Sequence, residues 1–223
     1  MRRHSAALLL IAVVACHRAG ADNTATAATS GVTRADSGIG ARDPRFIPLT
    51  PFPGDVQLLL GDPDSAGPFV MRIHELPGTI VPPHSHPVDE HITVVQGTWL
   101  FGIGDKFDST ALRRLPTGSY AFAPAGTSMF AASPEDAIVQ VHGVGPFHIK
   151  WAGGLATFDE PGSTVFHFRR GARVLTPLGP GTIREGYASG SVIQYELVAA
   201  DGHRFMASES DVRPDASAPP GAV

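Results

Sequence analysis

Residues 78–91 read GTIVPPHSHPVDEH, a stretch that brings two histidines and a glutamate close together in the chain. His84 and His86 are two residues apart, and side chains at i and i+2 of an extended strand point to the same face. Glu90 follows after a bend at Pro87, so its carboxylate can return to the same point. Two histidines and a carboxylate on one side of a cation form a facial triad, which leaves positions open for substrate or oxygen. The stretch therefore predicts a metal site on these three residues.

The chain around this stretch reads as short apolar runs separated by Pro and Gly. The 223 residues include 25 Gly and 20 Pro, which indicate many turns. Outside the N-terminal apolar run, no window of twelve or more residues has helical periodicity. Spacing of this kind predicts an all-β sandwich or barrel. We expect strands at Val56–Leu60, Phe69–Leu76, His91–Gln96, Trp99–Ile103, Ser119–Ala123, Met129–Ala132, Ile138–His142 and His148–Trp151.

Two segments resemble the sequence motifs of the cupin family. Gly78, His84, His86, Glu90 and Gly97 match its first motif, G-x5-H-x-H-x3-E-x6-G, at every position, and residues 118–126 (G-x5-PAG) resemble its second. The resemblance covers about residues 46–155, and we assign residues 45–158 to a cupin domain. It implies a double-stranded β-helix (jelly-roll) barrel with the site at its wider end, and homodimers formed through edge strands. Exposed strand edges also favour pairing with a second copy.

The second motif departs from the family pattern at its metal-ligand position. Met129 stands where the family places a fourth ligand, a histidine, and a thioether suits iron, manganese or zinc poorly. Three interpretations stay open. The metal is held by His84, His86 and Glu90 alone; or His142, which shares a strand face with Gln140, replaces the missing ligand; or the site has lost its metal and binds an organic ligand.

The resemblance also implies a cofactor and a class of partner. A divalent metal is expected, with Fe(II) or Mn(II) favoured and Zn, Ni and Cu left open. Whether the chain is an enzyme stays open: one hypothesis is dioxygenase- or isomerase-type chemistry on a small organic molecule. The alternative is a non-catalytic small-molecule or metal-binding envelope lipoprotein. Strand alternation gives Trp99, Phe101, Phe122 and Gln140 as candidate pocket residues.

The N-terminus indicates export. Residues 1–15 combine two arginines with an apolar run too short to span a bilayer, and the single cysteine, Cys16, follows at once. Residues 13–16 resemble a bacterial lipobox, which implies lipidation of Cys16 and a membrane anchor; the alternative is an ordinary signal with an incidental cysteine. Residues 16–44 then form a flexible tether. We expect an envelope lipoprotein on the periplasmic side, with the outer membrane slightly favoured because residue 17 is not aspartate.

The C-terminal part has its own composition. Residues 164–214 give four or five short strands, which resemble a small SH3- or Tudor-like barrel; the alternative is that these strands extend the first sheet. Residues 215–223 read as a disordered tail. The net charge of -4, without a basic run, argues against a nucleic-acid partner. No G-x-S-x-G elbow, P-loop or dinucleotide fingerprint is present.

Overall fold

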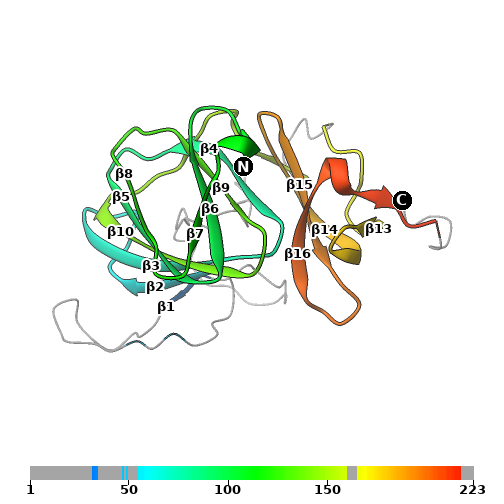
Figure 1. Cartoon of the computed structure of the whole chain (residues 1–223), viewed down its shortest axis with the longest axis horizontal. Coiled ribbons are helices and arrows are strands. Elements are labelled where there is room, and N and C mark those ends of the chain that lie inside the picture. The colour runs from blue at the N-terminus through cyan, green and yellow to red at the C-terminus, as the bar shows by residue number, and fades with distance from the viewer. Residues whose placement is uncertain (1–31, 35–46, 48, 50–54, 160–164, 217–223) are drawn as a thin grey trace, which may run out of the picture.

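A computed structural model of the chain describes residues 32–34, 47, 49, 55–159 and 165–216. The described chain forms two β units side by side, a larger barrel unit and a smaller C-terminal unit (Figure 1). The barrel unit holds β1 (Val32–Arg34), β2 (Val56–Leu60), β3 (Gly67–Glu75), β4 (Thr79–Ser85), β5 (Glu90–Gln96), β6 (Thr98–Ile103), β7 (Arg113–Pro116), β8 (Tyr120–Ala123), β9 (Met129–Ser133), β10 (Ala137–Gly145) and β11 (Lys150–Trp151). The short 3-10 helix η1 (Ser109–Ala111) precedes β7.

The barrel unit is a jelly roll. One sheet has the order β1-β2-β3-β10-β5-β8 and the other has the order β11-β4-β9-β6-β7. Counted from β3 to β10, the first sheet therefore contains the first, eighth, third and sixth strands, and the second contains the second, seventh, fourth and fifth. This order is the double-stranded β-helix, in which two Greek keys face each other across one core. The all-β, cupin-type fold expected from the sequence is confirmed.

Alternation along each strand fills the space between the two sheets. On β5, Ile92 and Val94 are buried in the core, while the alternating residues His91 and Thr93 face outward. On the neighbouring β10, Val139 and Val141 are each 1% exposed. The opposing sheet contributes large side chains to the same core, namely Val81, Trp99, Phe101, Met129 and Ala131.

The strands expected in this unit are observed, with three additions, one of which is β4, the strand that carries His84. β7 is an exposed edge strand whose sequence, Arg-Arg-Leu-Pro, lacks the apolar alternation that identified the others. β1 pairs in parallel with β2, so residues 32–34 of the expected tether belong to a sheet. Residues 1–31, including the expected signal peptide and Cys16, lie outside the described residues. In the part of the chain that is described, no helix is long and apolar enough to cross a membrane.

The C-terminal unit has its own sheet and its own core. Its strands run in the order β16-β15-β14-β13-β17, with β12 pairing β14, and so do not extend either barrel sheet. Their buried side chains, among them Phe166, Ile183, Tyr195 and Leu197, form a second apolar cluster. The expected likeness to SH3 or Tudor domains stays a prediction. The strands are β12 (Ala156–Thr157), β13 (Arg173–Thr176), β14 (Gly179–Ser189), β15 (Val192–Val198), β16 (Arg204–Ser208) and β17 (Arg213–Pro214), with the 3-10 helix η2 (Glu209–Asp211) between the last two.

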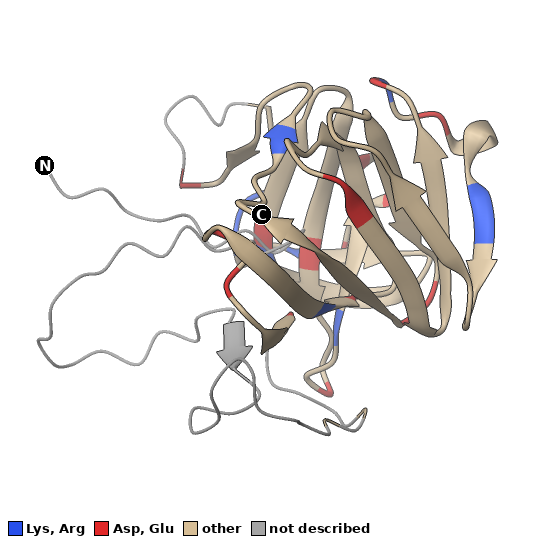
Figure 2. Cartoon of the chain, turned by 90° about the vertical axis from the view of Figure 1, so that its left-hand side faces the viewer, with Lys and Arg blue, Asp and Glu red and all other residues tan. Residues whose placement is uncertain are grey.

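The chain end is tied to this unit before the described residues stop. Asp215 donates its backbone N–H to the Arg173 carbonyl and receives the Arg173 guanidinium at 3.3 Å. The expected disordered tail therefore does not begin at residue 215, and residues 217–223 lie outside the described part. Figure 2, in which the barrel unit faces the viewer, shows basic and acidic residues interspersed, with long uncharged stretches of strand between them.

The two units are joined through β4 and β16. The Gln194 side chain, which is fully buried, accepts from the Ile80 N–H and donates to the Ile80 carbonyl. Met206 donates its N–H to the Pro77 carbonyl at 2.8 Å. Gly78 has a φ of +82°, and a Cβ there would lie 2.0 Å from the Met206 carbonyl oxygen, so only glycine permits this approach. Tyr187 and Met206 also pack in the barrel core, so the units share buried surface.

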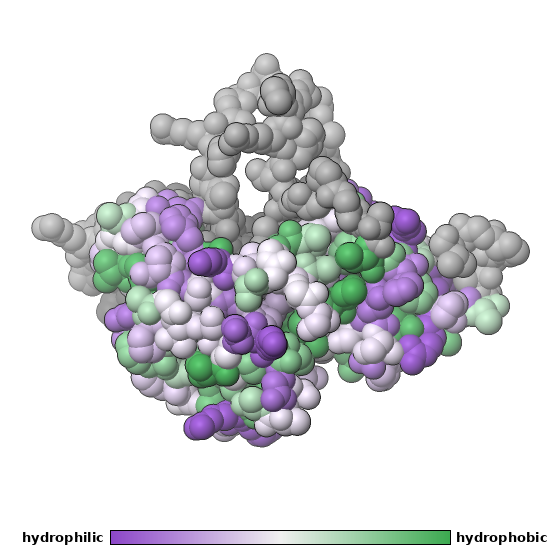
Figure 3. Space-filling view, turned by 90° about the horizontal axis from the view of Figure 1, so that it is seen from above, coloured by the Kyte–Doolittle hydropathy of each residue, from purple (hydrophilic) through white to green (hydrophobic). Residues whose placement is uncertain are grey.

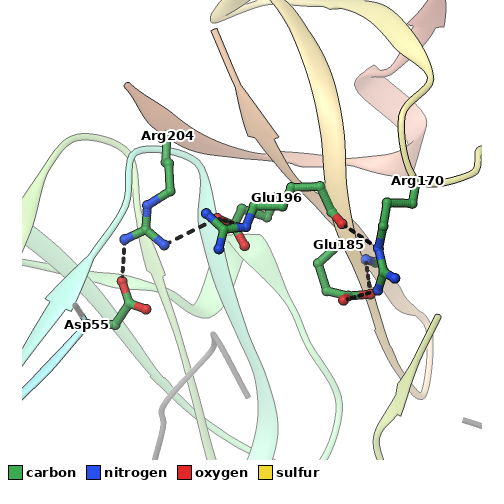
Figure 4. A network of polar contacts seen from close by, with 7 residues as sticks. Asp55, Arg170, Glu185, Glu196 and Arg204 are labelled. Carbon is green, nitrogen blue, oxygen red and sulfur yellow. Dashed lines mark hydrogen bonds and ion pairs between the residues drawn. The ribbon is translucent and has the colours of Figure 1, made fainter. Parts of the chain in front are cut away.

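A charged bridge crosses the same junction. Arg204 donates to Asp55, which precedes β2, at 2.7 Å and to Glu196 on β15 at 3.2 Å (Figure 4). Both carboxylates are almost fully buried. Farther along in the same view, Arg170 contacts Glu185, but this arginine is half-exposed. Loss of Arg204 would leave the buried Asp55 carboxylate without this cation and would leave Glu196 with the Arg184 guanidinium at 3.8 Å.

We expect Arg204→Met to lower the free energy of unfolding by about 3–5 kcal/mol, because breaking a buried ion pair leaves an uncompensated charge. Arg170→Met is the matched control, and we expect it to cost less than about 1 kcal/mol because its ion pairs are exposed to solvent. Chemical denaturation of the three proteins measures the difference. Equal costs would show that the junction does not depend on this bridge.

A third buried carboxyl near the junction, that of Glu75, makes stability depend on pH. Burial raises the pKa of Glu75 to about 8, and the charge of Asp55 adds to the rise. Between pH 4.5 and about 8 the folded protein therefore keeps a proton that the unfolded chain releases. Stability contributed by this group is complete below that range and is lost as the pH rises through it.

Replacing Glu75 with Gln should flatten this part of the stability profile, since the neutral amide has no proton to lose. Denaturation midpoints from about pH 5 to about pH 9 test this, with the exposed Glu135→Gln as the control. If the Glu75→Gln profile keeps the fall seen in the parent protein, another group is responsible for it.

Candidate metal centre

Two prolines shape the strand that carries the first histidine. Pro82 and Pro83 have no N–H to give to a sheet, and the pairing of β4 with β9 shifts register between Val81 and His84. Next to this irregularity the Pro82 carbonyl accepts a hydrogen bond from His84 Nδ1 at 2.7 Å. His84 is only 4% exposed, so its ring is held inside the barrel by its own strand.

The second histidine is held by two segments that are distant in the sequence. His86 Nδ1 donates to the His148 carbonyl at 2.9 Å, and the ring stacks on Phe147 with centroids 3.9 Å apart. Its backbone carbonyl accepts the Gly126 N–H at 2.8 Å, which ties the first sequence motif to the second. Asp89 adds a further tie by accepting the Ala125 N–H. The imidazole therefore has little freedom to turn.

Both rings present the same nitrogen to the interior. Because Nδ1 of His84 and of His86 is bonded to a carbonyl, Nδ1 bears the proton and Nε2 keeps its lone pair. A backbone carbonyl on the other ring nitrogen is the usual arrangement that orients a histidine toward a metal. The two rings meet edge to face with centroids 5.0 Å apart.

Glu90, the first residue of β5, completes the set. Its Oε2 atom lies 3.7 Å from His86 Nε2, and both atoms are buried without a hydrogen-bond partner in the described structure. An unsatisfied buried polar atom is costly. A cation between this oxygen and this nitrogen would satisfy both, so the donor chemistry of the site fits a divalent metal.

Burial also sets the protonation of these groups. It lowers the pKa of His84 to about 4 and that of His86 to about 3, the latter helped by the neighbouring His84. Both imidazoles are therefore neutral at pH 7, the form that binds metal. Burial raises the pKa of Glu90 to about 8. The carboxyl is thus held neutral by its surroundings, and a bound cation favours its ionised form.

The donor atoms of His84, His86 and Glu90 do not surround one common point in this structure. Among the residues that the structure describes, no three His, Cys, Asp or Glu side chains are close enough to hold an ion as they stand. His86 and Glu90 already face each other, and the His84 ring lies 5.0 Å from the His86 ring, measured between centroids. The His84 ring has a Trp151 neighbour with centroids 5.2 Å apart.

The residue at the family's fourth ligand position is a core residue. Met129 is 2% exposed, packs in the barrel core, and pairs in register with His84. Its side chain therefore lies on the inner surface, beside the strand that carries the first ligand. Thioethers fill irregular apolar spaces well.

Three other residues expected at the site, Gln140, His142 and Phe122, lie on the outer face of the barrel. Val139 and Val141 fill the core, so Gln140 and His142 on the same strand face outward, and His142 stacks on His91. The hypothesis that His142 supplies a fourth ligand is therefore wrong, and Gln140 does not line the interior. Phe122 is 45% exposed and also packs on His91, so it is not a pocket residue.

The two remaining pocket candidates face the interior. Trp99 and Phe101 are buried in the barrel core and stack on each other with centroids 5.2 Å apart. The indole Nε1 of Trp99 is buried without a hydrogen-bond partner in the described residues. It is a donor inside an otherwise apolar wall.

The segment after β10 contributes contacts that the sequence did not reveal. Phe147 stacks on His86, the His148 carbonyl orients the same ring, and Trp151 covers His84. His148 contributes only its backbone carbonyl to the site. The sequence signal was limited to two aromatic residues near a predicted strand, without any motif.

Comparisons with known proteins show no family model and no curated protein that matches the chain. Similar solved structures include a double-stranded β-helix protein from Klebsiella pneumoniae (23% identity, 48% of this chain and 96% of that one, TM-score 0.38). Another is an RmlC-like cupin from Desulfovibrio desulfuricans (23% identity, 40% of this chain and 79% of that one, TM-score 0.33). A third is a salicylate 1,2-dioxygenase from Pseudaminobacter salicylatoxidans (10% identity, 40% of this chain and 26% of that one, TM-score 0.35). At these identities and TM-scores the likenesses carry no argument about function, and the cupin-type assignment rests on the strand order.

The position of His142 leads to a direct test. We expect His142→Ala to bind a divalent metal as well as the parent protein does, because its ring is on the outer face. His86→Ala should bind none while the barrel stays folded, which circular dichroism checks. Titration with Mn(II) or Fe(II), followed by metal analysis, measures both variants. Equal loss of metal in the two would place His142 at the site after all.

Proposed function

We propose that the chain is an exported metal protein in which His84, His86 and Glu90 hold a divalent cation and the barrel interior binds a small organic molecule. The observation that carries this proposal is the pair of buried, unpartnered atoms, His86 Nε2 and Glu90 Oε2, 3.7 Å apart. The carbonyls that fix both Nδ1 atoms support the same conclusion. Nitrogen and carboxylate donors suit Fe(II) or Mn(II), and they are also compatible with Zn, Ni and Cu.

A cation held by His84, His86 and Glu90 would supply Lewis acidity toward an oxygen of the organic molecule and, as Fe(II) or Mn(II), an electron donor for dioxygen. The chain supplies the surroundings. Phe147 and Trp151 pack against the two imidazoles and keep water from them. The buried Trp99 Nε1–H offers a hydrogen bond to an acceptor oxygen of a ligand inside the barrel. Together these groups favour a small, partly apolar molecule that carries oxygen.

Catalysis and binding are the two uses of such a site. A site with open coordination positions supports dioxygenase- or isomerase-type chemistry. Met129 favours the second candidate, a non-catalytic binding protein, because an apolar core side chain occupies the inner surface beside His84. Turnover of a small organic acid or carbonyl compound by the metal-loaded protein decides between the two.

Two further parts of the proposal concern location and assembly. A lipid on Cys16 would place the chain at the envelope membrane. Pairing of two copies is supported by β8, an edge strand of the first sheet whose Tyr120 and Phe122 are 56% and 45% exposed. Such an edge is protected when a second sheet covers it.

The metal content of the purified protein tests the proposal. Protein prepared without chelator or a histidine tag should contain about one transition metal per chain, and His84→Ala should lose it. His203→Ala, at an exposed histidine of the C-terminal unit, is the matched control and should keep it. Absence of metal even after addition of Fe(II) or Mn(II) would overturn the metal assignment and leave an organic ligand as the occupant.

The position beside His84 gives a gain-of-function test. We expect Met129→His to tighten Mn(II) binding, because position 129 lies on the inner surface and an imidazole is a better ligand than a thioether. Met129→Leu, which keeps the volume, should leave the affinity unchanged. Competition with a coloured chelator measures all three proteins. Unchanged affinity in Met129→His would show that this position does not reach the metal.

A further inference from the structure

A pocket of about 670 Å3 lies where the C-terminal unit meets the barrel. Ile80 and Phe107 line it from the barrel side, and Phe168 and Val192 line it from the other. Seen from above, hydrophobic residues occur along the boundary between the two units (Figure 3). None of the three candidate metal ligands lines this pocket, so it is a separate site. Its volume and its position between two units are typical of small-molecule sites.

Three polar side chains form a connected chain at one wall of this pocket. His167 Nδ1 donates to Glu209 Oε1 at 2.5 Å, and the Tyr195 hydroxyl donates to Glu209 Oε2. The His167 backbone N–H also lies 3.2 Å from Glu209 Oε2. Both oxygens of the carboxylate are therefore used by the protein itself. Glu209 orients the imidazole and has little capacity left for a ligand.

Within this hydrogen-bonded group of three side chains, His167 Nε2 is the ring nitrogen without a partner in the described residues. Because Nδ1–H goes to Glu209, the neutral ring keeps its lone pair on Nε2, and no hydrogen bond to that atom occurs in the described residues. The side chain is 78% exposed, so Nε2 is open to an incoming molecule. It is an acceptor and requires a donor from the ligand. The hydroxyls of Ser191, Ser208 and Ser210 line the same pocket and can accept or donate.

We propose that this pocket binds an uncharged aromatic alcohol, whose rings lie against Ile80, Phe107 and Phe168 and whose hydroxyl donates to His167 Nε2. The apolar walls from both units favour a flat hydrocarbon body. An anionic head group would face the Glu209 carboxylate, which repels it. A cationic head group would find the carboxylate already occupied. A neutral hydroxyl can donate a hydrogen bond to His167 Nε2, and the Glu209 carboxylate does not repel it.

Three naphthalene derivatives of nearly equal size test this assignment on the full-length protein. We expect 2-naphthol to bind more tightly than naphthalene, which lacks the hydroxyl, and than 2-naphthoate, which is an anion. In His167→Ala the dissociation constant of 2-naphthol should rise about five- to tenfold, the effect of one hydrogen bond. The dissociation constant of naphthalene should not change in that variant. Ligand fluorescence or calorimetry measures each one.

His203 provides a matched control for the histidine substitution. It pairs with Asp201 at 2.5 Å, also through Nδ1, but it lies outside the pocket. His203→Ala should therefore bind 2-naphthol as the parent does, while Phe107→Ala should weaken both 2-naphthol and naphthalene. Naphthalene binding as tight as 2-naphthol, a preference for 2-naphthoate, or an unchanged dissociation constant in His167→Ala would each overturn the proposal. Because the pocket contains none of the candidate metal ligands, this result is independent of metal content.

Discussion

Burial of a carboxyl group and two imidazoles inside an apolar barrel is the constraint on which the site depends. Glu90 is 6% exposed and its Oε2 atom has no partner in the described structure. Such a group costs free energy unless a cation or a hydrogen bond compensates it. The protein removes the corresponding cost for the histidines by giving each Nδ1 a backbone carbonyl. His86 Nε2 and Glu90 Oε2 remain without a partner in the described residues, which is the arrangement that the proposed ligand set requires.

The strand β4 connects this site to the rest of the molecule. At its start, Gly78 and Ile80 meet the C-terminal unit through Met206 and Gln194. Near its end, His84 pairs with β11 and presents its ring to the core. A short strand that is anchored at both ends has little freedom, so the C-terminal unit contributes to holding β4, which carries His84. The C-terminal unit therefore helps to fix the position of β4 and also packs against the barrel.

The sequence predicted the fold well because period-two alternation and Pro/Gly turns are local signals. Its motif spacing also indicated His84, His86 and Glu90, which are all buried in the structure, with His86 Nε2 and Glu90 Oε2 3.7 Å apart; their role as metal ligands stays a prediction. The sequence failed for His142 and Phe122 because alternation shows which residues share a face but not which face is inside. The volumes of Val139 and Val141 decide that question, and they matter only once the opposing sheet is present. Contacts between segments far apart in the chain, such as Phe147 on His86, had no local signal either.

The same limit explains why the pocket between the units was not foreseen. Its walls come from β4, from the loop after β6 and from β15 to η2, which are distant in the chain. His167 and Glu209 are 42 residues apart, and neither belongs to a motif. Neither residue stands out in the sequence. The C-terminal sheet brings both of them into one hydrogen-bonded group with Tyr195. Ile80 then has two roles, because its backbone binds Gln194 while the residue also lines the pocket. The junction that stabilises the two units therefore also creates the concave surface between them.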